Sequence, residues 1–303
     1  MIEITELVKR YGKVHALDGL TLAFEAGKVH GLLGPNGAGK TTTVRILSTL
    51  TNPTSGAAAV GGFDVAKQPV EVKRQIGVVH QTSNFDPELT ARETLFVHGL
   101  LYGMARAAIR ARSEEMLSFV ELSADANRRV STFSGGMKRR LAIARALMHE
   151  PRVILLDEPT VGLDAHARRK IWDLIRRLRE GGHTVLLTTH YIEEIEILAD
   201  HVAVIDRGRL IAEGTPCALL DRVGRVAVDC CYPDGTQVEF FDTREAATAR
   251  AAAIDVRTTI RRANLEDVFL LLTGRHVDPA SQEQGGVANV ANHGHHVARA
   301  HHS

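Results

Sequence analysis

The chain has 303 residues, of which 44% are hydrophobic and 24% charged, and its formal net charge is +1. This composition is ordinary for a globular protein and lacks the basic excess typical of nucleic-acid binding, so we expect no nucleic-acid partner. Cys217, Cys230 and Cys231 form no CxxC pair, and we expect small side chains in a C-terminal strand rather than disulfides. The N-terminus has no signal-peptide core, and no run of about 18 apolar residues predicts a membrane span.

Strand and helix patterns alternate over the first 220 residues. Short alternating strands lead to the apolar segment "VHGLL", which runs directly into a glycine-rich turn and a helix extending to about Leu50. Buried strands are predicted at "RVILLDEP" and "TVLLTTH", with an amphipathic helix between them that Asp164 begins and Gly181 ends. Residues 90–122 have helical periodicity, broken near Gly103. Such alternation predicts an α/β fold with a parallel sheet.

Composition changes after residue 220. We predict a domain at 1–220, containing a helical subdomain at about 86–150, then a small α+β domain at 221–274 and a disordered tail at 275–303. The tail could bind a transition metal, or be solvated with only incidental metal affinity, because histidines are dense there. They are His293, His295, His296, His301 and His302.

The stretch "GPNGAGKTT" matches the phosphate-loop pattern G-x-x-x-x-G-K-[ST]. Its glycines let successive main-chain amides face a phosphate, Lys40 supplies a positive charge, and the Thr41 hydroxyl can ligate Mg²⁺. A buried strand precedes the loop and a helix follows it, as this motif requires. We therefore predict a nucleotide phosphate site made of Gly34, Pro35, Asn36, Gly37, Ala38, Gly39, Lys40, Thr41 and Thr42.

Polar residues follow the predicted buried strands. Asp157 ends one strand, where it can hold Mg²⁺, and Glu158 comes next, where it can reach an attacking water. His190 ends another strand, at the sheet edge that binds ligands, and is predicted to position a γ-phosphate or water. Gln81 follows the strand "IGVVH" and could contact Mg²⁺ or water. Tyr11, in an early loop, could stack on a base.

The stretch "TFSGGMKRRLAIARAL" predicts a helix from Met137 onward. Ser134 before it is a natural N-cap, but Gly135 and Gly136 are unfavourable at a helix start unless the main chain must approach something closely. Unsatisfied amides at a helix N-terminus bind anions. We therefore predict that Ser134, Gly135 and Gly136 form an anion site, with the identity of the anion open at this point.

In this order, the motifs resemble those of the nucleotide-binding subunit of ATP-binding-cassette (ABC) transporters, over roughly residues 1–220. Tyr11 corresponds to the A-loop, "GPNGAGKT" to Walker A, Gln81 to the Q-loop, "FSGGMKRR" to the signature LSGGQ, "VILLDEP" to Walker B, "VGLD" ending at Asp164 to the D-loop, and His190 to the switch histidine. The signature differs from the family pattern LSGGQ at two positions: Phe133 stands in place of the first Leu, and Met137 in place of the final Gln. Any polar contact of that Gln is therefore absent.

The resemblance implies a P-loop ABC ATPase core, with a parallel sheet, an antiparallel β subdomain and a helical subdomain. It also implies ATP and Mg²⁺ as cofactors, the latter held by Thr41, Gln81 and Asp157. Two subunits would pack head to tail in the ATP-bound state, each ATP lying between the Walker motifs of one and the signature of the other. Glu158 would be the general base, with His190 and Lys40 assisting. Asp164 would bridge the two sites.

The segments "SNFDPELTARETL" and "NLEDVFLLLTGR" resemble the drug, daunorubicin-resistance and lipo-oligosaccharide exporter branch. That branch implies an ABC-2-type transmembrane partner and a position at the cytoplasmic face of the cell membrane. A non-transport ABC ATPase acting on ribosomes or DNA is an alternative, which a single uninterrupted cassette without a basic tract disfavours. A P-loop kinase or GTPase is another, and it would give Ser134 no role.

Overall fold

The computed structural model describes residues 1–82, 84–233 and 235–273, which belong to two compact units dividing after Leu210. That division falls earlier in the chain than the domain boundary predicted at residue 220. The predicted tail at 275–303, with its histidines, lies outside the described residues. Across the described part of the chain, no helix is both long and apolar enough to cross a membrane.

The first unit begins with an antiparallel sheet of strand order β2-β1-β4-β5. These strands are β1 (Ile2–Tyr11), β2 (Val14–Phe24), β4 (Ser55–Val60) and β5 (Phe63–Asp64). Strand β1 turns into β2 at Gly12, whose φ is +58°. Tyr11 is therefore the last residue of β1 and pairs with Val14, rather than lying in the predicted loop.

A second sheet has the order β10-β9-β3-β8-β7-β6 and holds the predicted buried strands. They are β3 (Val29–Leu33), β6 (Ile76–Val79), β7 (Val153–Asp157), β8 (Thr184–Thr189), β9 (His201–Asp206) and β10 (Arg209–Gly214). From β6 to β9 neighbouring strands pair in parallel. Strands β3, β7 and β8 are buried along their whole length, which explains their continuous apolar runs.

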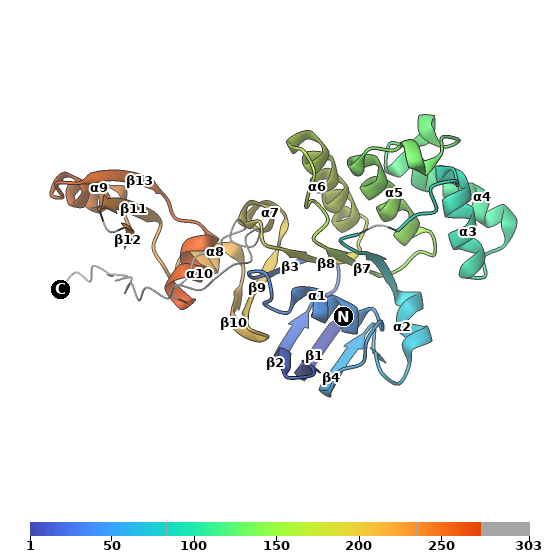
Figure 1. The fold of residues 1–303 in the computed structure, drawn as a ribbon, viewed down its shortest axis with the longest axis horizontal. Coiled ribbons are helices and arrows are strands. Elements are labelled where there is room, and N and C mark those ends of the chain that lie inside the picture. The colour runs from blue at the N-terminus through green and yellow to red at the C-terminus, as the bar shows by residue number, and fades with distance from the viewer. Residues whose placement is uncertain (83, 234, 274–303) are drawn as a thin grey trace. The chain divides into compact units, whose positions relative to one another are not determined.

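Helices cover both faces of this sheet. In Figure 1, α1 (Lys40–Leu47) and α6 (Ala165–Glu180) lie on opposite faces. The Asp164 carboxylate accepts the Ala167 amide at 2.8 Å and Gly181 follows the last turn, so both predicted caps of α6 are confirmed. Helix α1 ends before the predicted Leu50. The shorter helices α2 (Pro69–Gln75) and α7 (Ile192–Leu198) precede β6 and β9.

The helical subdomain consists of α3 (Ala91–Leu101), α4 (Arg106–Phe119) and α5 (Gly135–Leu147), which pack on one another (Figure 1). The 3₁₀ turns η1 (Ser123–Asp125) and η2 (Val130–Thr132) connect α4 to α5. Gly103, with φ of +71°, separates α3 from α4, as the broken periodicity predicts. Helix α5 begins at Gly135, so both signature glycines lie in its first turn rather than before the helix.

The second unit has an antiparallel sheet of order β12-β11-β13. Its elements are α8 (Pro216–Leu220), β11 (Val226–Tyr232), β12 (Gly235–Phe241), α9 (Arg244–Ala252), β13 (Arg257–Arg262) and α10 (Leu265–Thr273). Cys230 is buried in β11, as predicted. The expectation fails for Cys231, which faces the other side of the same strand and is exposed, and for Cys217, which is exposed in α8.

Candidate functional site

The phosphate loop joins β3 to α1, as its sequence predicts. Gly39 caps α1 with φ of +110°, and a Cβ there would lie 2.7 Å from the Ala16 carbonyl oxygen, so only glycine fits. The Ala38 amide donates to the Pro35 carbonyl at 3.2 Å and closes the loop. The buried Lys40 Nζ donates to the Gly34 carbonyl at 2.7 Å, which holds the ammonium inside the curl of the loop.

Lys40 and Glu158 form a buried ion pair. The Nζ of Lys40 lies 3.4 Å from Oε1 of Glu158, and both side chains are less than a tenth exposed. Burial lowers the pKa of Lys40, and the Glu158 carboxylate opposes that shift. Burial alone would raise the pKa of Glu158, but the hydrogen bond from His190 and the charge of Lys40 outweigh it and hold that pKa below its usual value. The Glu158 side chain is therefore a carboxylate near neutral pH.

Side chains from the strands on either side of β7 contact Glu158. Gln81, which follows β6, donates its Nε2 to Oε2 of Glu158 at 3.4 Å. His190, which follows β8, has its Nδ1 3.3 Å from Oε1 of the same carboxylate. Parallel strands end at the same sheet edge, which explains why three sequence-distant motifs meet there. The structure thus brings together Lys40, Gln81, Glu158 and His190.

Asp157 is held by hydroxyl groups. Its Oδ1 accepts from the Thr41 hydroxyl at 3.2 Å and from the Thr188 hydroxyl at 2.7 Å. Sequence reasoning missed Thr188, a fully buried residue of β8. The available signal was a threonine pair closing an otherwise apolar buried strand, immediately before His190.

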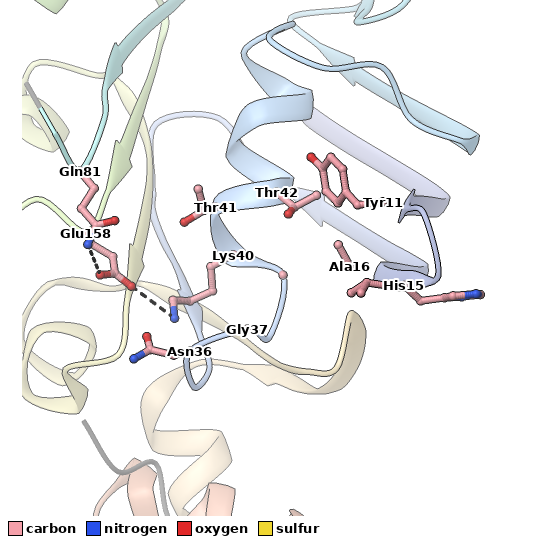
Figure 2. A pocket seen from close by; sticks show the side chains of 12 residues that line it. Tyr11, His15, Ala16, Asn36, Gly37, Lys40, Thr41, Thr42, Gln81 and Glu158 are labelled. Carbon is pink, nitrogen blue, oxygen red and sulfur yellow. Dashed lines mark hydrogen bonds and ion pairs between the residues drawn. The ribbon is translucent and has the colours of Figure 1, made fainter. Parts of the chain in front are cut away.

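An open cavity of about 330 Å³ lies over the phosphate loop (Figure 2). Figure 2 shows the Tyr11 ring beside Thr42 at one end and the Lys40–Glu158 pair with Gln81 at the other. Tyr11 is 44% exposed, so its ring is available for stacking, and Lys9 Nζ lies 5.0 Å from its centroid. Asn36, Gly37 and Thr41 also line the cavity. An aromatic ring at one end and a phosphate loop at the other suit a nucleotide.

The predicted signature residues lie elsewhere. Ser134 caps α5 and accepts the Met137 amide at 3.3 Å, which confirms it as the N-cap. A Cβ on Gly136 would lie 2.9 Å from Cβ of Ala167 in α6, whereas one on Gly135 would meet only Leu163 Cδ2, at an ordinary 3.6 Å. Among the described residues that line the nucleotide cavity, Ser134, Gly135, Gly136 and Asp164 do not appear.

The parallel sheet, its phosphate loop and the paired acidic residues define a P-loop nucleotide hydrolase. Residues 17–161 match the family model described as ABC transporter. The chain is 40% identical over 297 residues to "Nod factor export ATP-binding protein I" of Paraburkholderia xenovorans, covering 91% of this chain and 98% of the relative. It is 41% identical over 302 residues to "Daunorubicin resistance ATP-binding protein DrrA2" of Streptomyces coeruleorubidus, covering 89% of this chain and 94% of the relative.

Solved structures agree. A structure described as the ATP-binding subunit of an ABC transporter superimposes with a TM-score of 0.67 at 29% identity, covering 73% of this chain and 92% of that one. The dimeric cassette MJ0796 in a post-hydrolysis state with ADP and Pi superimposes with a TM-score of 0.65 at 30% sequence identity. The match covers 71% of this chain and 98% of that one. The chain belongs to the ABC transporter family, as an ATP-binding subunit. It binds and hydrolyses ATP, as the sequence predicts.

Proposed function

We propose that this ATPase powers export of a drug-like, polyketide, lipid or saccharide compound through an ABC-2-type membrane subunit. Two relatives support the proposal by name, one for Nod factor export and one for daunorubicin resistance. The subunit acts at the cytoplasmic face of the cell membrane and takes no nucleic acid.

The convergence of side chains on Glu158 is the observation that carries the catalytic proposal. In this mechanism Glu158 accepts a proton from the attacking water, whose oxygen bonds to the γ-phosphorus as the bond to the β–γ bridging oxygen breaks. The lowered pKa of Glu158 keeps its side chain ionised near neutral pH, so that it can accept this proton. His190 holds the water and γ-phosphate, and Lys40 turns its charge to the β- and γ-phosphates. The products are ADP and phosphate.

The oxygen atoms around Asp157 suit Mg²⁺. The Thr41 hydroxyl and the Asp157 carboxylate already lie within 3.2 Å of each other. Gln81 uses its Nε2 toward Glu158, so its amide oxygen is the atom left for a metal. Magnesium prefers such oxygen ligands and, when bound, neutralises phosphate charge. Thr41, Asp157 and Gln81 therefore form the proposed metal site.

The proposed dimer completes the site. Helix α5 has 13 residues, and its first-turn amides lack partners within the helix. Ser134, Gly135 and Gly136 contact the γ-phosphate of ATP held by Lys40 of a second copy, and Asp164 bridges the two sites. Their position outside this chain's own nucleotide cavity supports binding in trans. The dimeric MJ0796 cassette supports the same arrangement.

The variant Glu158→Gln tests the catalytic proposal. It keeps the size of the side chain but removes its basicity, so we expect hydrolysis to fall at least 10²-fold while ATP binding persists. With the membrane subunit present, saturating MgATP should trap the Glu158→Gln variant as an ATP-bound dimer. Glu180→Gln, exposed at the end of α6, is the matched control and should hydrolyse normally. Near-normal turnover by Glu158→Gln would exclude Glu158 as the general base. If this variant stayed monomeric with saturating MgATP and the membrane subunit, the trans arrangement would be excluded.

A further inference from the structure

Arg139 and Arg145 of helix α5 hold the main chain that carries Gln81. Arg139 donates Nη1 to the His80 carbonyl at 2.6 Å and Nη2 to the Gln81 carbonyl at 2.7 Å. Arg145 donates to the Asn84 carbonyl at 3.2 Å, and its guanidinium carbon lies 4.6 Å from the Phe85 ring centroid. Helix α5 is thus fastened to the segment that follows β6.

Arg139 is the stronger of these attachments. Only 6% of it is exposed, so its charge must be compensated locally. Burial lowers its pKa, and the Asp157 carboxylate opposes the shift. The planar guanidinium places two donors on consecutive carbonyl groups, and charge-assisted hydrogen bonds of this kind are stronger than neutral ones. A lysine carries a single compact charge and cannot reproduce that fork.

These contacts connect two parts of the ATPase. The N-terminus of α5 carries Ser134, which under the proposed function contacts ATP held by the other subunit. The Gln81 side chain reaches Glu158 in this chain's own site. Helix α5 and the hydrogen bonds of Arg139 link Ser134 to the main chain of Gln81. The main chain of Gln81 is therefore hydrogen-bonded to the same helix whose N-cap is Ser134.

We propose that Arg139 is a positioning residue that makes Gln81, and through it Glu158, respond to ATP bound at the signature of the same chain. It acts through main-chain carbonyls and not on the nucleotide itself. Loss of this attachment should lower turnover and the cooperativity between the two sites, while leaving ATP affinity intact. The inference rests on the proposed trans arrangement of the dimer.

Arg140 offers a matched control. It is the next residue of α5 and also donates to main-chain carbonyls, those of Val120 at 2.7 Å and Glu121 at 3.0 Å. Those carbonyls follow α4 and lie away from Gln81 in the chain. Arg139→Lys and Arg140→Lys thus make the same chemical change on the same helix, and only the first touches the Gln81 segment.

The experiment uses the full chain with its membrane subunit and measures hydrolysis against ATP concentration. We expect Arg139→Lys to lower kcat about 10- to 100-fold, with unchanged ATP affinity and a Hill coefficient near 1. Arg140→Lys should stay within about twofold of the wild type. Equal kcat losses in both variants, or a kcat loss in Arg139→Lys that leaves the Hill coefficient at the wild-type value, would overturn the inference.

A double-mutant cycle separates positioning from general destabilisation. If Arg139 acts through Gln81, Arg139→Lys should cost little further activity in a Gln81→Ala background. Additive losses would overturn the inference. Arg139→Gln serves if the lysine variant does not fold. A failure of the proposed function would be detected by a different variant. In that case Glu158→Gln would retain its turnover or stay monomeric, regardless of the results for the arginine variants.

Discussion

Thr188 joins the two acidic residues of the site: its hydroxyl donates to Oδ1 of Asp157 at 2.7 Å and accepts the main-chain amide of Glu158 at 3.1 Å. Thr188 lies on β8, in register with Asp157 on the neighbouring β7. The Asp157 carboxylate and the main chain of Glu158 are therefore both held by a residue of another strand. This relationship makes Thr188 a test of how precisely the acidic pair must be held.

We expect Thr188→Val to lower kcat about 10-fold or more. The substitution preserves shape but removes both hydrogen bonds, so Asp157 and Glu158 lose their common anchor. It should also cost about 1–3 kcal/mol of unfolding free energy, because two buried hydrogen bonds are lost, although Thr41 still donates to Asp157 and the Glu158 amide still donates to the Thr188 carbonyl at 3.0 Å. Thr188→Ser keeps the hydroxyl and should retain most activity. ATPase assays and urea unfolding measure both effects, and full activity in the valine variant would contradict the role.

The signature glycines should differ in their response to alanine. Gly135→Ala meets no close neighbour, so stability should be unchanged or rise by up to about 1 kcal/mol. Its methyl group nevertheless stands where a phosphate is proposed to approach, and hydrolysis with the membrane subunit should fall strongly. Gly136→Ala should lower stability, because its methyl would press on Ala167. Thermal unfolding and ATPase rates separate the two; a fully active Gly135→Ala would argue against phosphate binding there.

Tyr11 should contribute to nucleotide affinity without contributing to the fold. It is 44% exposed at the end of β1 and lies outside the buried core, so Tyr11→Ala should change unfolding little. Loss of base stacking should weaken ATP binding by about 1–3 kcal/mol, with little change in kcat at saturation. Tyr11→Trp keeps an aromatic face and should bind ATP normally. Titration with a fluorescent ATP analogue measures this, and unaltered binding by the alanine variant would remove the stacking role.

His98 should make stability depend on pH. Burial, together with the charges of the nearby His149 and Arg145, lowers the pKa of His98 to about 4. The unfolded chain takes up this proton near pH 6.5 and the folded chain only near pH 4. Stability is therefore complete above pH 6.5 and falls as the pH drops toward 4, by at most about 3 kcal/mol from this group.

The measurement is urea unfolding between pH 4.5 and 7.5. We expect His98→Phe, which cannot take up a proton, to show a shallower decline toward acid pH than the wild type. His166→Gln, at an exposed position early in α6, should decline as the wild type does. Identical slopes for the wild type and His98→Phe would show that other groups carry the acid sensitivity.

Features written in short contiguous stretches could be predicted from sequence. The phosphate loop, the caps at Ser134, Asp164 and Gly181, and the break at Gly103 depend on the local main-chain conformation, which neighbouring residues set. The order of strands and helices and the class of fold followed from apolar periodicity. The amino-acid order was therefore sufficient for the family, the nucleotide and the motifs.

The tertiary structure decided which side chains meet. Thr188 contacts Asp157 only because β8 lies beside β7 in one particular register, and Arg139 reaches Gln81 only because α5 packs beside β6. Gly136 is required in part because α6 comes close to it. Such contacts join residues tens of positions apart, and local periodicity carries no information about the register or packing that places them. Parallel strands bring those distant residues to one edge, and there the site is assembled.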